Sequence, residues 1–215
     1  MSFNILYIVI ILLIVVGSVI LHELSHGLVA FLLGDTTAKD AGRLTLNPIK
    51  HIDPYMSILV PVLLYMLHAP VFGGAKPVPV DYRNLKWREW GMALVALAGP
   101  MTNLLLAFIS FLIGHFAGFL YGSGGEVLAF IFSELVYVNL GFMIFNLIPV
   151  PPLDGSRILY AISPDVIRSI LMEIEPYGFF VVYGLILLFG EVLSGVMLSG
   201  MNGILSFFYM IVGAN

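Results

Sequence analysis

Residues 3–33 read FNILYIVIILLIVVGSVILHELSHGLVAFLL, an apolar run that holds a short cluster of ionisable side chains at residues 22–26. A transmembrane helix needs about 20 consecutive apolar residues, so this run is long enough to cross a bilayer. No Lys or Arg precedes it, and it is far longer than the core of a secretory signal. The run therefore predicts a permanent membrane span with His, Glu and His inside it.

The composition of the whole chain also indicates a membrane protein. Of the 215 residues, 60% are hydrophobic and 10% are charged, and the mean hydropathy is +1.04. A soluble domain carries about 25% charged residues. The net charge of −4 and the lack of a basic cluster exclude nucleic acid as a partner. Because the chain has no cysteine, any metal must bind His, carboxylate or backbone oxygen atoms.

The rest of the chain predicts an all-α multi-pass membrane protein that forms one domain over residues 1–215. Residues 38–53 and 71–90 are expected to form short strands and loops, because segments 43–46 and 78–80 are extended in character. The last apolar stretch fits one full span and a shorter helix, with a break near residues 190–191 or 199–203. Four apolar stretches follow the first, at residues 55–72, 91–121, 126–150 and 177–212.

The positive charges predict the topology. All nine Lys and Arg lie between Lys39 and Arg168. They fall on one face if residues 91–121 and 126–150 form a hairpin and residues 55–72 enter and leave on one side. The positive-inside rule makes that face cytoplasmic. We therefore expect a multi-pass protein of the cell membrane with a re-entrant or shallow segment at 55–72 and an external N-terminus.

The cluster at residues 22–26, HELSH, has the spacing of a metal site on a helix. Residues four apart lie on one helix face, so His22 and His26 can bind one ion. Glu23 lies beside them, where it can take a proton from water. A chance match is the alternative, but a charged residue inside a membrane helix costs about 2.5–3.5 kcal/mol on insertion scales. That cost favours a cation that compensates Glu23.

Two histidines leave the site incomplete, because catalytic zinc normally takes three protein ligands and a water molecule. Asp154 is the best third candidate, since it follows the proline-rich segment PVPPL at residues 149–153, which interrupts the apolar stretch. Irregular backbone at membrane depth is buried in protein or lines a water-filled cavity. The alternative is that Asp154 caps a helix that begins near Ser156.

Other polar residues are expected to have structural roles. Asn103 and Asn139 lie in apolar stretches, where interhelical hydrogen bonds are their usual function. His51, His68 and His115 are expected at the membrane interface rather than as metal ligands.

HELSH at residues 22–26 and NLIPVPPLDG at residues 146–155 together resemble the site-2 protease family of intramembrane metalloproteases. GRLTLNP at residues 42–48 and AGPMTN at residues 98–103 are similar to the same family. The resemblance extends over about residues 20–175. PDZ-like and CBS domains are missing, so the chain resembles a minimal member.

The resemblance implies a three-helix catalytic core, expected within residues 3–160, with additional C-terminal helix or helices at 177–212. It also implies one Zn²⁺ in the membrane near the cytoplasmic side. His22, His26 and Asp154 match the family's zinc ligands, and Glu23 matches its general base. Asn146 matches an Asn that orients substrate or polarises the scissile carbonyl. The implied substrates are single-span membrane proteins whose cytoplasmic portion is released.

Residues 73–80 suggest how such a substrate is held. A membrane substrate must be unwound before its peptide bonds are accessible, and an extended segment near the site can bind it by strand addition. The alternative for these residues is an ordinary surface turn.

Two other functions compete with proteolysis. A divalent-metal transporter also places His and carboxylates in membrane helices, but it does not need Glu23 beside His22, and paired halves are expected. An inactive homologue that binds membrane segments is the second rival, and the intact Glu23 disfavours it.

Overall fold

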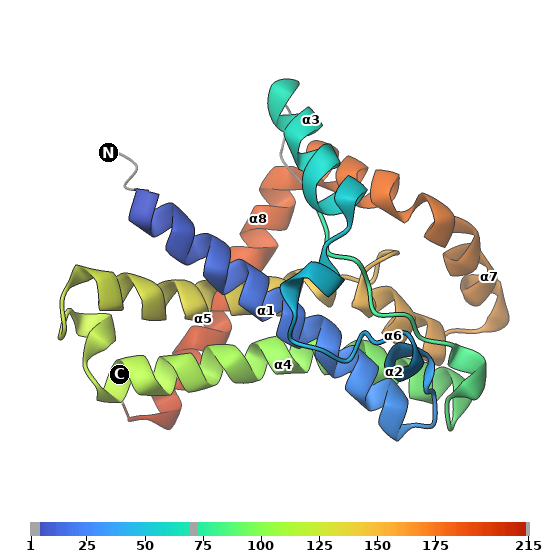
Figure 1. Ribbon diagram of the computed structural model, residues 1–215, viewed down its shortest axis with the longest axis horizontal. Coiled ribbons are helices and arrows are strands. Elements are labelled where there is room, and N and C mark those ends of the chain that lie inside the picture. The colour runs from blue at the N-terminus through green and yellow to red at the C-terminus, as the bar shows by residue number, and fades with distance from the viewer. Residues whose placement is uncertain (1–4, 69–72, 214–215) are drawn as a thin grey trace.

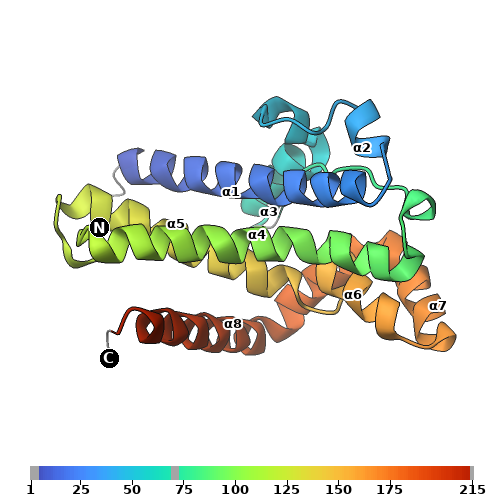
Figure 2. The ribbon, with the colours of Figure 1, turned by 90° about the horizontal axis from the view of Figure 1, so that it is seen from below.

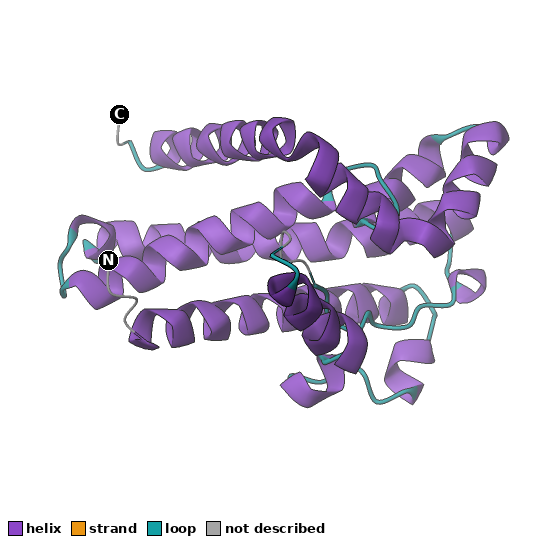
Figure 3. Ribbon diagram, turned by 90° about the horizontal axis from the view of Figure 1, so that it is seen from above, coloured by secondary structure: helices purple, strands orange, loops and turns teal. Residues whose placement is uncertain are grey.

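Figure 1 shows the computed structural model, in which residues 5–68 and 73–213 are described. These residues form helices joined by loops and turns, with no strand among them (Figure 3). The longest helices are α1 (Ile5–Leu32), α4 (Arg88–Phe116), α5 (Glu126–Asn146) and α8 (Gly178–Ile211). Shorter ones are α2 (Thr37–Asp40), η1 (Pro48–His51), η2 (Pro54–Leu59), α3 (Val60–Met66), η3 (Tyr82–Asn84), η4 (Phe119–Tyr121), α6 (Asp154–Ile162), α7 (Asp165–Ile174) and η5 (Glu175–Tyr177).

Four helical segments of the described chain are long and apolar enough to cross a membrane. They are α1, α4, α5 and the run Asp165–Ile211, which joins α7, η5 and α8. The expectation of an all-α multi-pass membrane protein is therefore confirmed. Large apolar side chains on these helices face outward, as lipid contact requires, among them Ile5, Leu13, Leu32, Phe116, Phe180 and Leu188.

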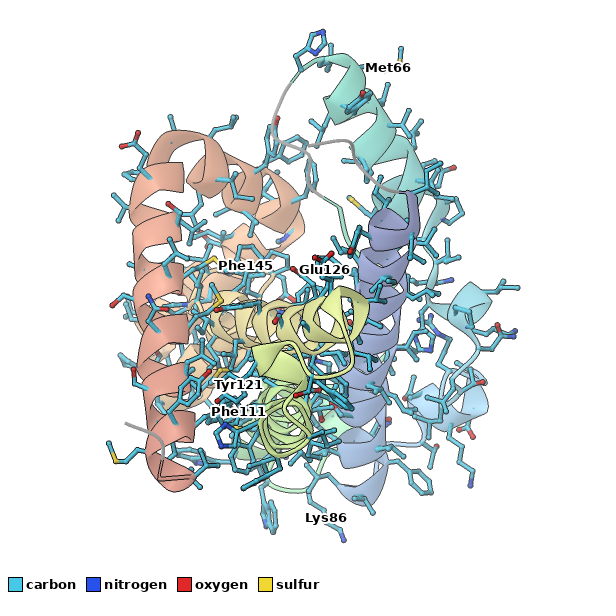
Figure 4. All side chains as sticks on the ribbon, turned by 90° about the vertical axis from the view of Figure 1, so that its left-hand side faces the viewer. Met66, Lys86, Phe111, Tyr121, Glu126 and Phe145 are labelled. Atoms are coloured by element: carbon cyan, nitrogen blue, oxygen red, sulfur yellow. The ribbon has the colours of Figure 1, made fainter. Side chains whose placement is uncertain are left out.

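Helices α1, α4 and α5 lie side by side, and the second half of α8 crosses α5 on the face away from α1 (Figures 1 and 2). The core between α4, α5 and α8 is apolar and centres on Phe111, which is fully buried (Figure 4). Its other buried members are Ala107, Val136, Leu140 and Phe208. This packing fixes α4 against α5. It therefore also fixes the side chains of these two helices that face residues 22–26 of α1.

The C-terminal stretch contains two helical parts that meet at a kink inside α8. α8 has 34 residues, and Phe189 inside it has non-helical φ and ψ of −125° and 20°. Gly190 follows directly, so the break occurs at the first of the two expected positions. Gly weakens a helix by about 1 kcal/mol relative to Ala, which explains why the chain bends there.

The expected re-entrant segment forms a short helical excursion (top of Figure 1). η2 and α3 follow each other directly and form one helical stretch, Pro54–Met66, which is too short to span a bilayer. Residues 69–72 lie outside the described part. The chain then returns to the start of η2, where the Gly74 amide donates to the Met56 carbonyl at 3.1 Å. The segment thus begins and ends at the same place, as expected for one that does not cross.

The two short strands expected from the sequence were wrong. At residues 43–46 the Thr45 amide donates to the Arg43 carbonyl at 3.0 Å, which closes a tight turn. Residues 78–80 lie between Pro77 and Asp81 and form no ladder. Proline supplies no amide donor, so Pro77 and Pro79 leave too few donors for regular pairing.

Residues 76–81 instead form an extended connector that is tied to several parts of the fold. The Lys76 amide donates to the His51 carbonyl at 2.8 Å, and the Arg43 guanidinium donates to the Lys76 carbonyl at 2.8 Å. At the other end, the Asp81 amide donates to the buried Asp35 carboxylate at 2.8 Å. The connector is therefore held across α1.

Candidate metal centre

α1 places His22 and His26 on one buried face, one helical turn apart. Their Nε2 atoms lie 3.0 Å from each other. The Asp154 Oδ2 atom lies 3.2 Å from Nε2 of His22 and 3.4 Å from Nε2 of His26. Of the His and acidic groups in the described residues, only these three form a cluster that can hold a metal ion.

Asp154 is the first residue of α6, and this start of the helix lies beside the two histidines. Leu153 occupies the N-cap position, and Asp154 Oδ2 is buried without accepting a hydrogen bond from the described residues. The alternative that Asp154 caps a helix is thus disfavoured. Gly155 allows the approach, because a Cβ atom there would collide with the carbonyl oxygens of Leu147 and Ile148.

The hydrogen-bond partners of the two rings determine their tautomers. His26 Nδ1 lies 2.7 Å from the Val95 carbonyl oxygen. A carbonyl only accepts hydrogen bonds, so Nδ1 carries the proton, and Nε2 of the neutral ring presents a lone pair. His22 Nδ1 lies 2.6 Å from Asn103 Oδ1. The same reasoning applies to His22, provided that the Asn103 atom beside it is the oxygen of the side-chain amide and not the nitrogen.

A chain of buried amides fixes the orientation of Asn103. The Asn139 side-chain amide donates to the Leu135 carbonyl at 2.8 Å and to Ser18 Oγ at 3.0 Å, so its oxygen faces the other way. That oxygen accepts from Asn103 Nδ2 at 2.8 Å. Asn103 therefore turns its own oxygen toward His22. Both asparagines are fully buried, and they connect α1, α4 and α5.

The centre therefore brings three electron-pair donors together with no proton between them when both rings are neutral. Two imidazole nitrogens and a carboxylate within 3.4 Å repel one another unless a cation lies among them. Tetrahedral zinc with bonds of about 2.0–2.1 Å separates its ligand atoms by about 3.3 Å. The donor set and its spacing fit Zn²⁺.

Gly99 on α4 forms the back of this centre. A Cβ atom built on Gly99 would lie 2.5 Å from the Nε2 atoms of both His22 and His26. No other amino acid fits without displacing the imidazoles, which explains the glycine in the segment AGPMTN.

Glu23 lines the same cavity as the three clustered residues, with a volume of about 150 Å³. Its Oε2 atom accepts a hydrogen bond from the Val78 amide at 2.8 Å. The connector 76–81 thus holds the carboxylate in place. Gly27 lets the connector approach α1, because a Cβ there would lie 2.9 Å from a methyl group of Val78.

Asn146, the last residue of α5, also lines this cavity. Its side-chain amide donates to the Phe142 carbonyl one turn earlier at 3.0 Å. The structure thus brings together all five site residues predicted from the sequence.

The remaining histidines lie in other surroundings. His51 Nε2 donates to the Thr45 carbonyl at 2.9 Å, and His115 Nδ1 lies 2.6 Å from the Tyr121 hydroxyl. His68 is exposed. Sequence reasoning missed the contact of Asn103 with the centre and the roles of Val95 and Gly99. The segment AGPMTN was a usable signal for Gly99 and Asn103, since it belongs to the family resemblance.

A family model and several known proteins match the sequence of this chain. A family model described as peptidase family M50 matches residues 123–189, which include Asn146 and Asp154. YwhC of Bacillus subtilis is 43% identical over 168 residues, which are 75% of this chain and 72% of YwhC. The chain belongs to peptidase family M50. The resemblance carried by HELSH and NLIPVPPLDG is therefore confirmed.

Two further M50 relatives align over most of the chain. Rip2 of Mycolicibacterium smegmatis is 31% identical over 186 residues, 84% of this chain and 69% of Rip2. A protein of Methanocaldococcus jannaschii is 31% identical over 160 residues, 74% of this chain and 73% of its own length. All three relatives are named zinc metalloproteases. No solved structure matches the chain.

Proposed function

We propose that this M50 peptidase is an intramembrane zinc protease that cleaves single-span membrane proteins within or near their transmembrane segment. In this proposal His22, His26 and Asp154 hold one Zn²⁺. The observation that carries it is the convergence, within 3.4 Å, of the Nε2 atoms of His22 and His26 on α1 with the Oδ2 atom of Asp154 on α6. Of these two helices, α1 is long and apolar enough to span a membrane. Membership of the M50 family supports the same conclusion.

Zinc, when bound, supplies a Lewis acid that polarises a carbonyl and lowers the pKa of a bound water from 15.7 towards about 7. The protein supplies the base. Glu23 takes the proton of the attacking water and returns it to the leaving amine. The Val78 amide orients the Glu23 carboxylate for this transfer through their 2.8 Å hydrogen bond. Asn146, on the same cavity wall, donates a hydrogen bond to the scissile carbonyl.

The centre is proposed to lie toward the cytoplasmic side of the cell membrane. At 1.5 Å per residue, His22 lies about 26 Å from the start of α1 and about 15 Å from its end. Helices α2, α6 and α7 and the start of α4 lie at that near end (Figure 2). They carry Lys39, Arg88, Arg157 and Arg168, and the positive-inside rule favours a cytoplasmic position for them.

The connector 76–81 is proposed to hold the unwound substrate by strand addition. Val78 and Val80 line the cavity, and their backbone runs alongside Glu23. The Val80 amide makes no hydrogen bond to another described residue, so it is available as an edge donor. Because Val78→Pro also removes the hydrogen bond to Glu23, Val80→Pro is the cleaner test of edge binding.

The divalent-metal transporter is the main alternative. It gives no reason for Glu23 to face the same cavity as the clustered donors or to be held by Val78. An inactive homologue gives no reason to keep Glu23 either.

The decisive experiment compares Glu23→Gln with the parent protein. The substitution removes the base and leaves the three clustered donors, so bound zinc should stay near one ion per chain. Cleavage of a model single-span substrate should fall by at least 100-fold. Asp154→Ala should lose both zinc and cleavage. Near-normal cleavage by Glu23→Gln with one zinc bound would sink the assigned role.

A transporter gives a different pattern. Purified protein in vesicles would then move Zn²⁺ across the bilayer and leave every single-span substrate intact. A zinc-loaded protein that binds substrate spans without cutting them would instead identify the inactive homologue.

A further inference from the structure

A second cavity lies beside the metal centre. Its volume is about 650 Å³, against about 150 Å³ for the cavity that contains Glu23 and Asp154. Ligand pockets in proteins are usually about 300–1,000 Å³. The smaller cavity is thus too small for several substrate residues, whereas the second cavity is large enough. We call it the flanking cavity.

The flanking cavity lies between the start of α4, α6 and α7, with Tyr82 of η3 on one wall. Met92, Leu171 and Met172 give it an apolar lining. Arg83 and Arg88 lie at its edge and are exposed. In the proposed topology this edge faces the cytoplasm.

Among the described residues, two line both cavities, Tyr82 and Arg157. The Arg157 guanidinium lies 5.0 Å from the centroid of the Tyr82 ring and donates to Glu175 at 2.6 Å. Arg157 also follows Asp154 by one helical turn on α6. Tyr82 and Arg157, packed against each other, therefore form the partition between the two cavities. The Glu175 carboxylate of η5 holds Arg157 in place.

We propose that the flanking cavity binds substrate residues on the cytoplasmic side of the cleaved bond and takes one large apolar side chain among them. This inference rests on the proposed function. The substrate backbone passes the Tyr82–Arg157 partition, and the apolar side chain packs against Met92, Leu171 and Met172.

The charges of the cavity favour a peptide over an anionic lipid headgroup. Arg83 donates to the Asp81 carboxylate at 2.9 and 2.8 Å, and Arg157 is paired with Glu175. Two of the three arginines thus already have acidic partners, and Glu89 adds another negative charge. A phosphate group would meet little uncompensated positive charge there.

Cross-linking tests the occupant directly, because the chain has no cysteine of its own. Leu171→Cys is introduced into the Glu23→Gln protein, which binds substrate without cutting it. A model substrate carries one cysteine, moved residue by residue along the cytoplasmic side of its cleavage site. We expect disulfide formation at one or two adjacent substrate positions. Ile170→Cys is the matched control, since Ile170 is the preceding residue and does not line the cavity.

Cross-linking at Leu171→Cys should exceed that at Ile170→Cys by at least tenfold. Equal yields, or none at Leu171→Cys, would overturn the proposal. A maleimide tests the lipid alternative: vesicles of phosphatidylglycerol without substrate should leave Leu171→Cys as reactive as phosphatidylcholine vesicles do. Protection by phosphatidylglycerol alone would assign the cavity to a headgroup instead.

A specificity measurement provides the second test. Leu171→Trp fills the cavity, and Ile170→Trp adds the same ring outside it. The ratio of kcat/KM for substrates with Phe and with Ala at the cross-linked position should fall at least tenfold in Leu171→Trp only, within the 10–200-fold range of apolar pockets. An unchanged ratio with normal zinc content would refute the subsite. If the parent protein cleaved no single-span substrate, the proposed function would fail. The cysteine would then be moved along the cytoplasmic half of a model span, and cross-linking to Leu171→Cys but not to Ile170→Cys would still show that the cavity binds a membrane segment.

Discussion

At the scale of single residues, Asn103 offers the sharpest test of the metal centre, because it is uncharged and does not line the cavity. Asn103→Leu removes the acceptor for His22 Nδ1, so the ring is free to rotate and to change tautomer. Loss of such an outer partner typically costs a metal site 10–100-fold in affinity. We expect a fall in zinc affinity of that size, measured by competition with a chelator.

Ser110→Ala is the matched control, because Ser110 is buried on the same helix and takes no part in the hydrogen bonds of Asn103 and Asn139. The absorption spectrum of the Co²⁺-substituted protein adds a readout that general loosening of the helices does not mimic. It should change in Asn103→Leu and stay constant in Ser110→Ala. Unaltered affinity and spectrum in Asn103→Leu would mean that His22 needs no outside partner.

The site residues differ in how well the sequence predicted them. His22 and His26 were predictable as a pair, because a spacing of four residues on a helix is a local property. Asp154 was predictable from a break in an apolar stretch. The segment AGPMTN marked Asn103 through the family resemblance, but its contact with His22 did not follow from the sequence. That contact joins residues 81 apart in the chain and depends on how α1 packs against α4.

At the scale of elements, Asp35 controls where the connector 76–81 lies. Its Oδ2 atom accepts from the Asp81 amide at 2.8 Å, and its Oδ1 atom accepts from Thr37 and Asn84. Asp35→Asn turns an amide donor toward the Asp81 amide. A buried polar group without a hydrogen-bond partner costs about 1–3 kcal/mol of folding stability. We expect a lower melting temperature in detergent and faster hydrogen exchange at Asp81.

The pH dependence of this contribution follows from the charge of Asp35. Burial opposes its ionisation, but hydrogen bonds from Thr37, the Asp81 amide and Asn84 outweigh burial and lower the pKa of Asp35. A lowered pKa means that the stabilisation is complete above the unfolded value of about 4 and is lost as the pH falls through the folded value. The melting temperatures of Asp35→Asn and of the parent protein are therefore compared at pH 7. Asp40→Asn, at an exposed carboxylate with one hydrogen bond, should change little. Equal effects of both substitutions would contradict the prediction.

The elements that the sequence predicted correctly are those set by long apolar runs. α1, α4 and α5 follow from runs of about 20 residues or more, because lipid forces such segments to satisfy their own backbone. The strands at residues 43–46 and 78–80 were wrong, because extended propensity does not supply a pairing partner. Tertiary contacts to Asp35 and Glu23 determine the connector instead.

At the scale of the whole molecule, single cysteines can test the orientation in the membrane. Lys39→Cys, Lys86→Cys and Arg168→Cys should be protected from an impermeant reagent in intact cells. Ser123→Cys, in the turn between α4 and α5, should react. Reaction at Lys86→Cys with protection at Lys39→Cys would show that residues 55–72 cross the membrane after all.

The last prediction concerns how the whole molecule receives its substrate. His22 and Asp154 lie in a cavity of about 150 Å³, which does not admit an intact helix of about 10–12 Å diameter. If the substrate is a membrane span, as proposed, the span has to open near the cut before hydrolysis. Gly weakens a helix by about 1 kcal/mol and Pro by about 3 kcal/mol relative to Ala, and 1 kcal/mol changes a population about fivefold.

Replacing a Gly or Pro near the cut by Leu should slow cleavage at least fivefold. Membrane insertion and zinc content serve as controls and should stay constant. Equal cleavage rates for stiffened and parent spans would exclude helix opening as the limiting step.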